Sequence, residues 1–495
     1  MTLAYTIYLS FLGSLVVLLM PPHRVAWIRC TALAAATGGL ALALMGCASL
    51  ARQGFPVEIV NVAWVPVLGI SYHLSADGVS GVLVLLTGIA AVAGVLFSWN
   101  VERRLNQFFA LYLSLIGGVY GVFLSADLFL IFVFYEIAII PKYFLIAIWG
   151  STRREYGAMK LALYSFVGSA MVLLGLLAAY VEAGADSFDL SKLASHPYPV
   201  SFQRWVYPLV FLGFGILAGL WPFHTWAPTG HVAAPTAASM LLAGVVMKLG
   251  AYGCWRVAMT LFPSAVRNYA ALFAGMATMG IVYGALVALV QKDFKFVIGY
   301  SSVSHMGFVL LGLMSLNTVG LSGSIFQMFS HGVIAGLLFG VVGRMVYDRT
   351  HQRDLEILQS MDLHRLLPFA ATTFALAGFA SMGLPGFSGF VAELQILIGA
   401  WRSYPVLVLL SGLGILVGAA YSLRALQKAF YGKAWVAGVP HTVHTLPPMT
   451  WPERAGALLL LASTVVAGLF PGLLLQLIEP AIAVWLAGQG QGGGL

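Results

Sequence analysis

Long apolar stretches separated by short polar connections form the pattern along this chain. Segments of about 20 apolar residues recur, and each is long enough to cross the hydrocarbon core of a bilayer as a helix. They predict fourteen helices, over residues 3–20, 26–48, 78–99, 107–125, 128–149, 158–181, 206–224, 234–256, 269–290, 296–315, 320–346, 367–400 (interrupted), 405–430 and 454–476. The pattern is therefore typical of an all-α polytopic membrane protein.

Two polar connections are longer than the rest. Residues 52–77 contain the alternating "VEIVNVAWV" and an Asp77-Gly78 turn, which predict a small β-hairpin. Residues 183–205 are polar and irregular and are expected to form a loop. The first apolar segment lacks a basic cluster before it, so we expect a span there and not a cleavable signal.

Two segments carry helix-breaking residues at membrane depth. The prolines of "WPFHTWAPTGHVAAP", residues 221–235, predict the end of one helix and the turn into the next. Glycines and a proline crowd the stretch "GLPGFSGFVAEL" within residues 367–400, which predicts a broken helix. Broken helices occur in membranes only beside protein or a water-filled cavity.

Composition agrees with this pattern, because 60% of the 495 residues are hydrophobic and only 8% are charged. A soluble domain of this length needs far more charge on its surface. The three cysteines, Cys30, Cys47 and Cys254, lie in or near apolar segments without metal-ligand spacing and are interpreted as small hydrophobic residues.

The net charge of +8 arises from the loops. With the N-terminus outside, the inward connections hold Arg24, Arg29, Arg103, Arg104, Arg153, Arg154, Lys292, Lys295, Arg344, Arg349, Arg353, Arg365, Arg424, Lys428, Lys433 and Arg454. The outward connections hold only Arg52, Lys192, Arg204, Arg256, Arg267 and Arg402. This bias predicts that both termini face away from the cytoplasm, and it explains the charge without a nucleic-acid partner.

Several titratable residues fall within the predicted spans. They are Glu136, Lys142, Lys160, His224, His231, Lys248, His305, His331 and Glu393, with Asp127 at a helix edge. An ionisable group at the bilayer centre costs about 2.5–3.5 kcal/mol on insertion scales, so such groups usually face a hydrated interior. We interpret the set as a proton path. For Lys160 and Asp127, near helix ends, a purely structural role as helix–helix anchors stays open.

Glu136 and Lys142 belong to one predicted helix but are six residues apart. They do not share a face in a regular helix, so a direct ion pair requires that Pro141 re-aims one of them. The chain shows no phosphate loop, nucleophile–base pair or metal-ligand spacing, and no motif for NADH, flavin, iron–sulfur clusters or quinone. Any redox chemistry is therefore expected in other chains.

Four stretches together carry a family resemblance. They are "WPFHTWAPTGHVAAPTAASMLLAGVVMKLGAYG", "KDFKFVIGYSSVSHMGFVLLG", "MFSHGVIAGLLFG" and "LPGFSGFVAEL", with "YEIAIIPKYFLIAIWG" as a fifth. The chain resembles the antiporter-like membrane subunits of respiratory complex I over roughly residues 60–435, and within them the M-type branch. "SVSHMGFV" and the fourteen helices separate it from the L-type and N-type branches.

The resemblance implies two inverted five-helix repeats, helices 4–8 and 9–13, with discontinuous helices 7 and 12. The expected parts are residues 1–106 with the hairpin near 52–77, a first repeat at 107–256, a second at 269–430, and a loop, last helix and short tail at 431–495. It also implies a proton relay through Glu136, Lys248, His305, His331 and Glu393. His224 and His231 are expected to take up protons, since histidine titrates near physiological pH.

The chain departs from the family pattern at one position. The family's helix-7 lysine lies seven residues before the histidine of "PFHTW", where this chain has Leu217. Lys142 stands where most relatives have an apolar residue such as methionine. We hypothesise that Lys142 replaces the missing cation. The alternative is that its amine snorkels toward the cytoplasm.

Function and partners follow from the resemblance alone. It implies a proton-translocating subunit in a bacterial cytoplasmic membrane, beside L-like and N-like antiporter subunits, small K-, J-, A- and H-type subunits and a peripheral redox arm. That arm is expected to hold NADH, FMN, iron–sulfur clusters and the quinone site. Three alternatives stay open: an Mrp-type cation/proton antiporter subunit, a membrane-bound hydrogenase subunit, and a mainly structural subunit. Neighbouring genes or sodium-dependent growth discriminate the first of these.

Overall fold

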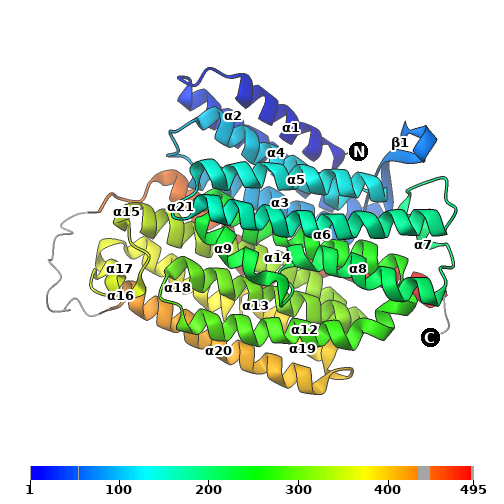
Figure 1. Ribbon diagram of the computed structural model, residues 1–495. Helices are drawn as coiled ribbons and strands as arrows, with labels where there is room; N and C mark the ends of the chain where they lie inside the picture. The colour runs from blue at the N-terminus through cyan, green and yellow to red at the C-terminus, as the bar shows by residue number, and fades with distance from the viewer. Residues whose placement is uncertain (1, 54, 433–445, 492–495) are drawn as a thin grey trace.

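The computed structural model describes residues 2–53, 55–432 and 446–491, and it shows a bundle of long helices running side by side (Figure 1). Within these residues thirteen helices are long and apolar enough to cross a membrane. The first half contains α1 (Ala4–Leu19), α2 (Val25–Gln53), β1 (Val57–Val65), β2 (Ile70–Ala76), α3 (Gly78–Phe97), α4 (Leu105–Leu124), α5 (Leu128–Trp149), α6 (Arg154–Glu182), α7 (Leu190–Ala194), α8 (Val200–Ala218), α9 (Trp226–Ala233), α10 (Thr236–Leu241), η3 (Leu242–Val246), α11 (Met247–Gly253) and η4 (Cys254–Met259).

The second half follows from Pro263. It contains α12 (Pro263–Val290), α13 (Phe294–Met314), α14 (Thr318–Phe339), η5 (Gly340–Tyr347), α15 (Asp348–Thr350), α16 (Leu355–Leu358), α17 (Leu363–Leu366), α18 (Pro368–Ser381), α19 (Ser388–Trp401), α20 (Pro405–Phe430), α21 (Trp451–Leu469) and α22 (Gly472–Gln491). Short 3₁₀ turns, η1 (Pro66–Leu68) and η2 (Phe223–Thr225), complete the elements.

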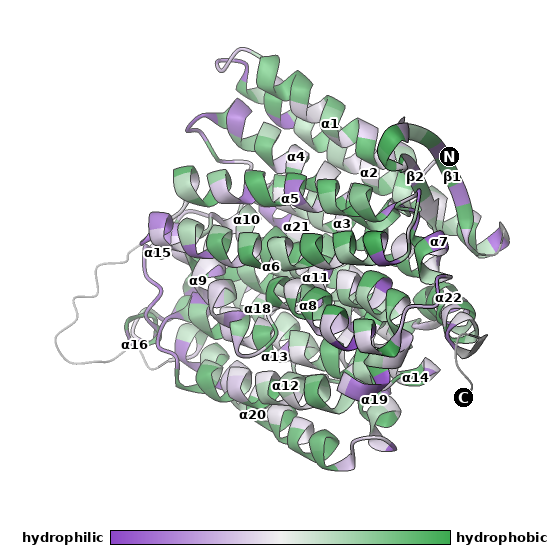
Figure 2. Ribbon diagram, turned by 45° about the vertical axis from the view of Figure 1, so that its right-hand side comes forward, coloured by the Kyte–Doolittle hydropathy of each residue, from purple (hydrophilic) through white to green (hydrophobic). Residues whose placement is uncertain are grey.

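The outer surface of the bundle is apolar along its middle. Figure 2 shows hydrophobic positions along the outer helices and hydrophilic ones mainly toward the two ends of the bundle. On α20, Leu413 and Leu416 are exposed by 52% and 68%. Leucines exposed over a whole helix face are unfavourable in water but match the hydrocarbon of a bilayer. The predicted multi-pass architecture is confirmed.

The predicted hairpin is present, but its turn is not where the sequence placed it. Strands β1 and β2 are antiparallel, and Val62 pairs with Tyr72. The chain reverses at Pro66–Gly69, where Gly69 has φ = 67°. The predicted Asp77-Gly78 turn is wrong, because Asp77 is the N-cap of α3 and its carboxylate accepts a hydrogen bond of 2.9 Å from the Ser80 backbone N–H. Aspartate before glycine suits a helix N-cap as well as a turn.

The polar stretch 183–205 is more ordered than predicted. It contains the short helix α7, and α8 begins at Val200, six residues before the predicted start. Asp189 caps α7 by accepting hydrogen bonds from the Ser191 and Lys192 backbone N–H groups at 2.9 and 3.2 Å. The prediction of a loop relied on the polarity of this stretch and did not recognise Asp189 as a helix cap.

The end of the chain also differs from the prediction of a short tail. Residues 472–491 form the helix α22, whose Ile478 and Ile482 are fully buried. Trp485 Nε1 donates a hydrogen bond of 2.8 Å to Thr260 Oγ1, which directly follows η4. At Gly78, the first residue of α3, a Cβ would lie 1.8 Å from the Leu477 carbonyl oxygen. Thus α22 packs across the ends of α3 and η4.

Each half of the bundle contains one short antiparallel backbone bridge between two helix N-caps, and the two bridges lie at opposite ends. An antiparallel bridge joins Asp127, the N-cap of α5, to Asp189, the N-cap of α7. A second bridge joins Asp293, the N-cap of α13, to Asp354, the N-cap of α16. Figure 1 shows α7 and α16 at opposite ends of the bundle. This arrangement is compatible with two repeats of opposite orientation.

The bridge of the first half also holds the hairpin. His73 Nδ1 on β2 lies 2.6 Å from Asp189 Oδ2, and His73 Nε2 lies 3.5 Å from Glu58 Oε2. The Ser71 backbone N–H donates to Asp127 at 3.0 Å. The hydrogen bond to Asp189 raises the pKa of His73 against the effect of burial. Burial would raise the pKa of Asp189, but hydrogen bonds from His73 and Ser191 hold it well below its usual range.

We expect the hairpin to be held more tightly at acidic pH than at alkaline pH. Because the folded pKa of His73 is raised, its stabilisation is complete below about pH 6.5 and is lost as the pH rises through the raised value. The stabilisation from ionised Asp189 is lost only in acid, as the pH falls below about 4, because its folded pKa is lowered. Hydrogen exchange of the β1 and β2 amides, corrected for intrinsic rates, should show less protection at pH 9 than at pH 6.

The variant His73→Gln is the control for this prediction. Glutamine keeps hydrogen-bonding groups but does not titrate between pH 6 and pH 9. Its hairpin should show the same corrected protection at both values. Equal pH dependence in the variant and the wild type would contradict the role of His73.

Candidate functional site

Two broken helices frame the interior of the bundle. Helix α8 ends at Ala218, and Gly219 has φ = 82°. Helix α18 ends at Ser381, Gly383 has φ = 70°, and α19 begins at Ser388. Positive φ at both breaks favours glycine, which lacks the Cβ that would clash there.

The predicted interruption of residues 367–400 is confirmed. The expected break at the proline-rich stretch is also present, because α8 ends at Ala218 and the same span resumes as the short helix α9. Only the position of the turn into the next span differs, since it comes at Ala234 and Pro235.

Lys248 lies at the centre of the bundle and is fully buried. It follows η3, a π-helical turn, and its Nζ donates a hydrogen bond of 2.6 Å to the carbonyl of Ala243 inside that turn. A π-turn shifts the backbone hydrogen bonds by one residue and is found mostly at functional sites. The irregular turn therefore supplies a backbone acceptor for the amine.

His331 on α14 is the side-chain partner of Lys248. Lys248 Nζ lies 2.7 Å from His331 Nδ1. The two helices approach closely at glycines, since a Cβ on Gly332 would lie 2.6 Å from the Gly244 carbonyl oxygen. Small residues at such crossings let membrane helices pack backbone against backbone. This contact places His331 within hydrogen-bonding reach of Lys248.

His305 on α13 continues the chain of contacts toward α19. The rings of His305 and His331 are 5.4 Å apart between centroids. His305 Nδ1 lies 3.2 Å from Glu393 Oε1, and His305 Nε2 lies 3.0 Å from Ser381 Oγ at the end of α18. Lys248, His331, His305 and Glu393 thus form an ordered series between the π-turn and the second break.

A small polar cavity of about 10 Å³ lies along this series. It is lined by His305, Gln327, Ser330, His331, Ile334, Ala380, Ser381, Gly389 and Glu393. This volume is at the lower limit for one water molecule. His331 Nε2 and Gln327 Oε1 are buried without a hydrogen-bond partner among the described residues. A water at this place would join His331 to His305.

The sequence analysis missed the polar side chains that support this series. Gln327 Nε2 lies 3.4 Å from His305 Nδ1, and Ser388 Oγ lies 2.8 Å from both Ser330 Oγ and Thr464 Oγ1. The spacing of Gln327 and His331 by four residues places them on one helix face and is a signal that was present in the sequence.

The two histidines near the first break lie apart from each other. Within the part of the chain that the structure describes, both ring nitrogens of His224 are buried without a hydrogen-bond partner, and its ring packs against Tyr283 with the centroids 5.2 Å apart. His231 on α9 lies with Nε2 3.4 Å from the Met247 sulfur, next to Lys248. Lys160 Nζ lies 3.4 Å from Thr229 Oγ1 of α9. Of these three residues, His231 is therefore the one that contacts the sequence neighbour of the central lysine.

Glu136 and Lys142 lie on α5, across α8 from the central series. Lys142 is fully buried, and its Nζ donates a hydrogen bond of 3.2 Å to Ser165 Oγ on α6. Glu136 forms no ion pair within 4 Å among the described residues. The structure thus brings together Lys248, His331, His305 and Glu393, and it leaves the α5 residues as a separate group.

Leu217 and Phe214 of α8 stand between the two groups. The Phe214 ring meets Tyr135 of α5 edge to face at 5.7 Å, and a Cβ on Gly250 of α11 would lie 2.9 Å from the Leu217 carbonyl carbon. Leu217 is 2% exposed. The place of the family's helix-7 lysine is therefore filled by packed apolar side chains.

Two basic residues that the sequence placed in loops lie at the ends of spans, Arg256 partly buried and Lys295 buried. Arg256 of η4 pairs with Asp77 and donates to Tyr252 Oη at 3.0 Å, which ties η4 to the start of α3. Lys295, in the first turn of α13, is 2% exposed, and its Nζ lies 3.4 Å from the Ala234 carbonyl. Neither contact is predictable from hydropathy, because each depends on helices far apart in the sequence.

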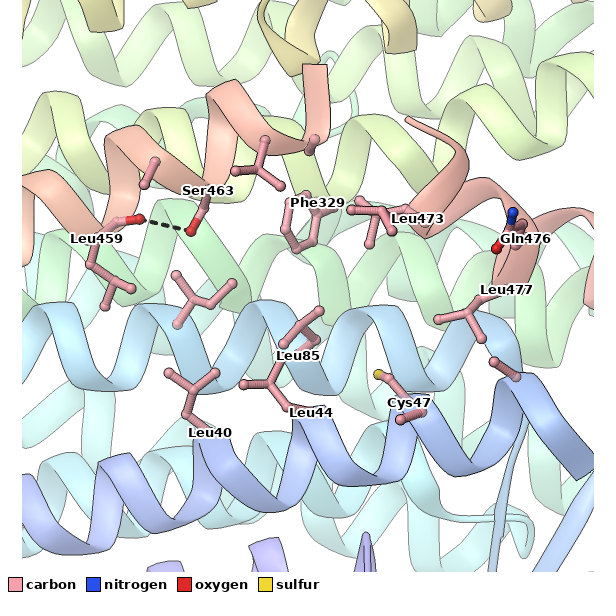
Figure 3. Close-up of a pocket in the computed structure, with 17 residues that line it drawn as sticks. Leu40, Leu44, Cys47, Leu85, Phe329, Leu459, Ser463, Leu473, Gln476 and Leu477 are labelled. Atoms are coloured by element: carbon pink, nitrogen blue, oxygen red, sulfur yellow. Dashed lines mark hydrogen bonds between the residues drawn. The ribbon is translucent and has the colours of Figure 1, made fainter. Parts of the chain in front are cut away.

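A larger cavity of about 540 Å³ lies between α2, α3, α14, α21 and α22 (Figure 3). Its lining is almost entirely leucine, alanine and other apolar side chains. Ser463 Oγ is already bonded to the Leu459 carbonyl at 2.8 Å, and the lining includes no histidine, lysine or carboxylate. This cavity is therefore unsuited to carry protons.

Comparison with known proteins agrees with this arrangement. Residues 125–418 match the family described as "NADH:quinone oxidoreductase/Mrp antiporter, TM". The chain is 37% identical over 434 residues to NADH-quinone oxidoreductase subunit M of Rhodobacter capsulatus, covering 85% of this chain and 83% of that one. It is 36% identical over 487 residues to NAD(P)H-quinone oxidoreductase chain 4 1 of Synechococcus sp. (strain JA-3-3Ab), covering 96% and 90%.

A solved structure shares the fold over the whole length. It is a chain of respiratory complex I from Thermus thermophilus with bound NADH, with a TM-score of 0.88 and 28% identity, covering 99% of this chain and 100% of that one. The chain described here belongs to the NADH:quinone oxidoreductase/Mrp antiporter family of membrane subunits.

Proposed function

We propose that this chain is a proton-translocating membrane subunit of a complex I-like NADH-quinone oxidoreductase. The observation that carries the proposal is the buried series Lys248, His331, His305 and Glu393, with contacts of 2.7 and 3.2 Å at its two ends. Every member exchanges a proton, and the series joins the bundle centre to the break between α18 and α19. The similarity to subunit M of Rhodobacter capsulatus supports the same function.

The geometry supports transfer in four stages. His231, beside Met247, delivers a proton to Lys248, and Lys248 passes it to Nδ1 of His331. His331 releases the proton from Nε2 through the small cavity to His305, which hands it to the Glu393 carboxylate. Glu393 then releases it at the broken helix. Because charges repel strongly at short range inside a protein, each proton that arrives favours the departure of the one ahead.

Other chains supply the electron transfer in this proposal. NADH, FMN, iron–sulfur clusters and quinone would bind to a peripheral redox arm and its membrane contact. This chain would lie beside L-like and N-like antiporter subunits and small K-, J-, A- and H-type subunits in a bacterial cytoplasmic membrane, with both termini on the outer side. The family's description covers both NADH:quinone oxidoreductases and Mrp antiporters, so an Mrp-type subunit is the second candidate.

Affinity purification through this chain, followed by reconstitution, tests the proposal. We expect redox subunits to co-purify and NADH oxidation by quinone to drive proton uptake into proteoliposomes. Sodium/proton exchange without redox subunits would instead assign the chain to an Mrp-type complex. Co-purification of a hydrogenase module would replace NADH as the electron donor.

A further inference from the structure

Lys142 is a buried amine that the central series does not use. It follows Pro141 within α5 and is 0% exposed. Its hydrogen-bond partner is the Ser165 hydroxyl at 3.2 Å. A lysine that snorkels ends at the surface, whereas this amine ends on a serine of the neighbouring helix. The free energy cost of burying the amine calls for a partner that carries negative charge.

Glu136 is the carboxylate that provides this charge. It precedes Lys142 on α5, and its Oε1 is buried without a hydrogen-bond partner among the described residues. It forms no ion pair with Lys142 among the described residues, and Lys142 lies six residues farther along the same helix, beyond Pro141. The carboxylate and the amine therefore act on each other without a direct ion pair.

Two serines of α6 lie beside this part of α5. Ser165 and Ser169 are 1% and 5% exposed and are four residues apart, so they lie one turn apart on one helix face. Ser165 Oγ accepts a hydrogen bond of 3.2 Å from Lys142 Nζ. Ser169, whose Oγ lies 3.5 Å from the Phe166 carbonyl oxygen, is one turn farther along α6 and so lies on the Glu136 side of Ser165, because the consecutive spans α5 and α6 run in opposite directions. A hydroxyl both accepts and donates a hydrogen bond, which is the property needed to pass a proton along a line.

We propose that Glu136, Ser169, Ser165 and Lys142 form a second proton-holding station, in which Lys142 takes the place of a cation on α8. The ammonium of Lys142 gives its proton to Ser165, each hydroxyl accepts one proton as it releases another, and the Glu136 carboxylate receives the last. The products are a neutral amine and a carboxylic acid, so charge and protons balance. The station rests on the proposed function and influences Lys248 through space, because Leu217 and Phe214 separate the two groups.

The experiment measures proton uptake per electron pair in proteoliposomes of the purified complex. Lys142→Met and Glu136→Gln should each lower this ratio, and the double variant should lower it no further, since residues of one unit do not add. The variant Ser165→Ala/Ser169→Ala should also lower this ratio, without removing either charged group. Ser411→Ala is the matched control, because Ser411 is also buried and is bonded to its own helix at the Leu407 carbonyl at 2.8 Å.

Two further variants separate the possible failures. Leu217→Lys placed in the Lys142→Met chain should restore part of the lost ratio by returning a cation to α8. Unchanged ratios in both Lys142→Met and the serine pair, beside a lost ratio in Lys248→Met, would overturn the station and leave the proposed function intact. An unchanged ratio in Lys248→Met would overturn the proposed function itself. If Lys142→Met fails to assemble on a native gel, the serine pair decides the outcome.

Discussion

Glu393→Gln is expected to lower proton translocation by about 10²-fold while the complex stays assembled, a loss typical for removal of one proton-transfer group. Glutamine fills the same volume but cannot hold the proton that His305 delivers across 3.2 Å. The series would then end at His305, whose other side-chain hydrogen-bond neighbours are the Ser381 hydroxyl and the Gln327 amide. Proton uptake by proteoliposomes during NADH oxidation by quinone checks this expectation.

Glu479→Gln is the matched control for Glu393→Gln. Glu479 lies exposed on α22, outside the polar interior. The control should translocate protons as the wild type does. Wild-type translocation by Glu393→Gln as well would contradict the release role and favour a mainly structural subunit.

Glu453→Gln is expected to destabilise the subunit by about 3–5 kcal/mol, because it leaves two arginines without their buried partner. Glu453 is 1% exposed and lies 2.6 Å from Arg344 Nε and 2.7 Å from Arg349 Nη2. It also accepts a hydrogen bond of 2.9 Å from the Thr450 backbone N–H at the start of α21. The thermal unfolding temperature of the purified complex, together with the yield of assembled complex, measures the effect.

Glu356→Gln controls for the general loss of a carboxylate. Glu356 forms an ion pair of 3.4 Å with Lys292, but both side chains are more than half exposed. Exposed pairs contribute about 0–1 kcal/mol, so the unfolding temperature should hardly change. Equal decreases of the unfolding temperature in Glu453→Gln and Glu356→Gln would show that the buried pairs of Glu453 with Arg344 and Arg349 stabilise the subunit no more than an exposed pair does.

The sequence predicted the spans well for a physical reason. Membrane helices must be long and apolar, so their pattern is visible in hydropathy alone. A lysine, histidine or glutamate in such a pattern stands out because of its cost, as Lys248 and Glu393 do. The break before Glu393 was equally visible, since glycine and proline mark it directly.

The contacts between these residues could not be predicted in the same way. The hydrogen bond from Lys248 to the Ala243 carbonyl depends on a π-turn, and no residue type within η3 predicts such a turn. The approach of Lys248 to His331 depends on the crossing at Gly244 and Gly332, which are 88 positions apart in the chain. Helix α22 was missed because glycine, glutamine and proline dilute its apolar pattern, although its contacts with the bundle stabilise it.

The paired bridges, Asp127 with Asp189 and Asp293 with Asp354, have a consequence for the two sides of the membrane. The same backbone bridge forms at either end of the bundle, so it does not depend on the side of the membrane on which it lies. In a chain with two repeats of opposite orientation, positions that open to one compartment in the first half would correspond to positions that open to the other compartment in the second.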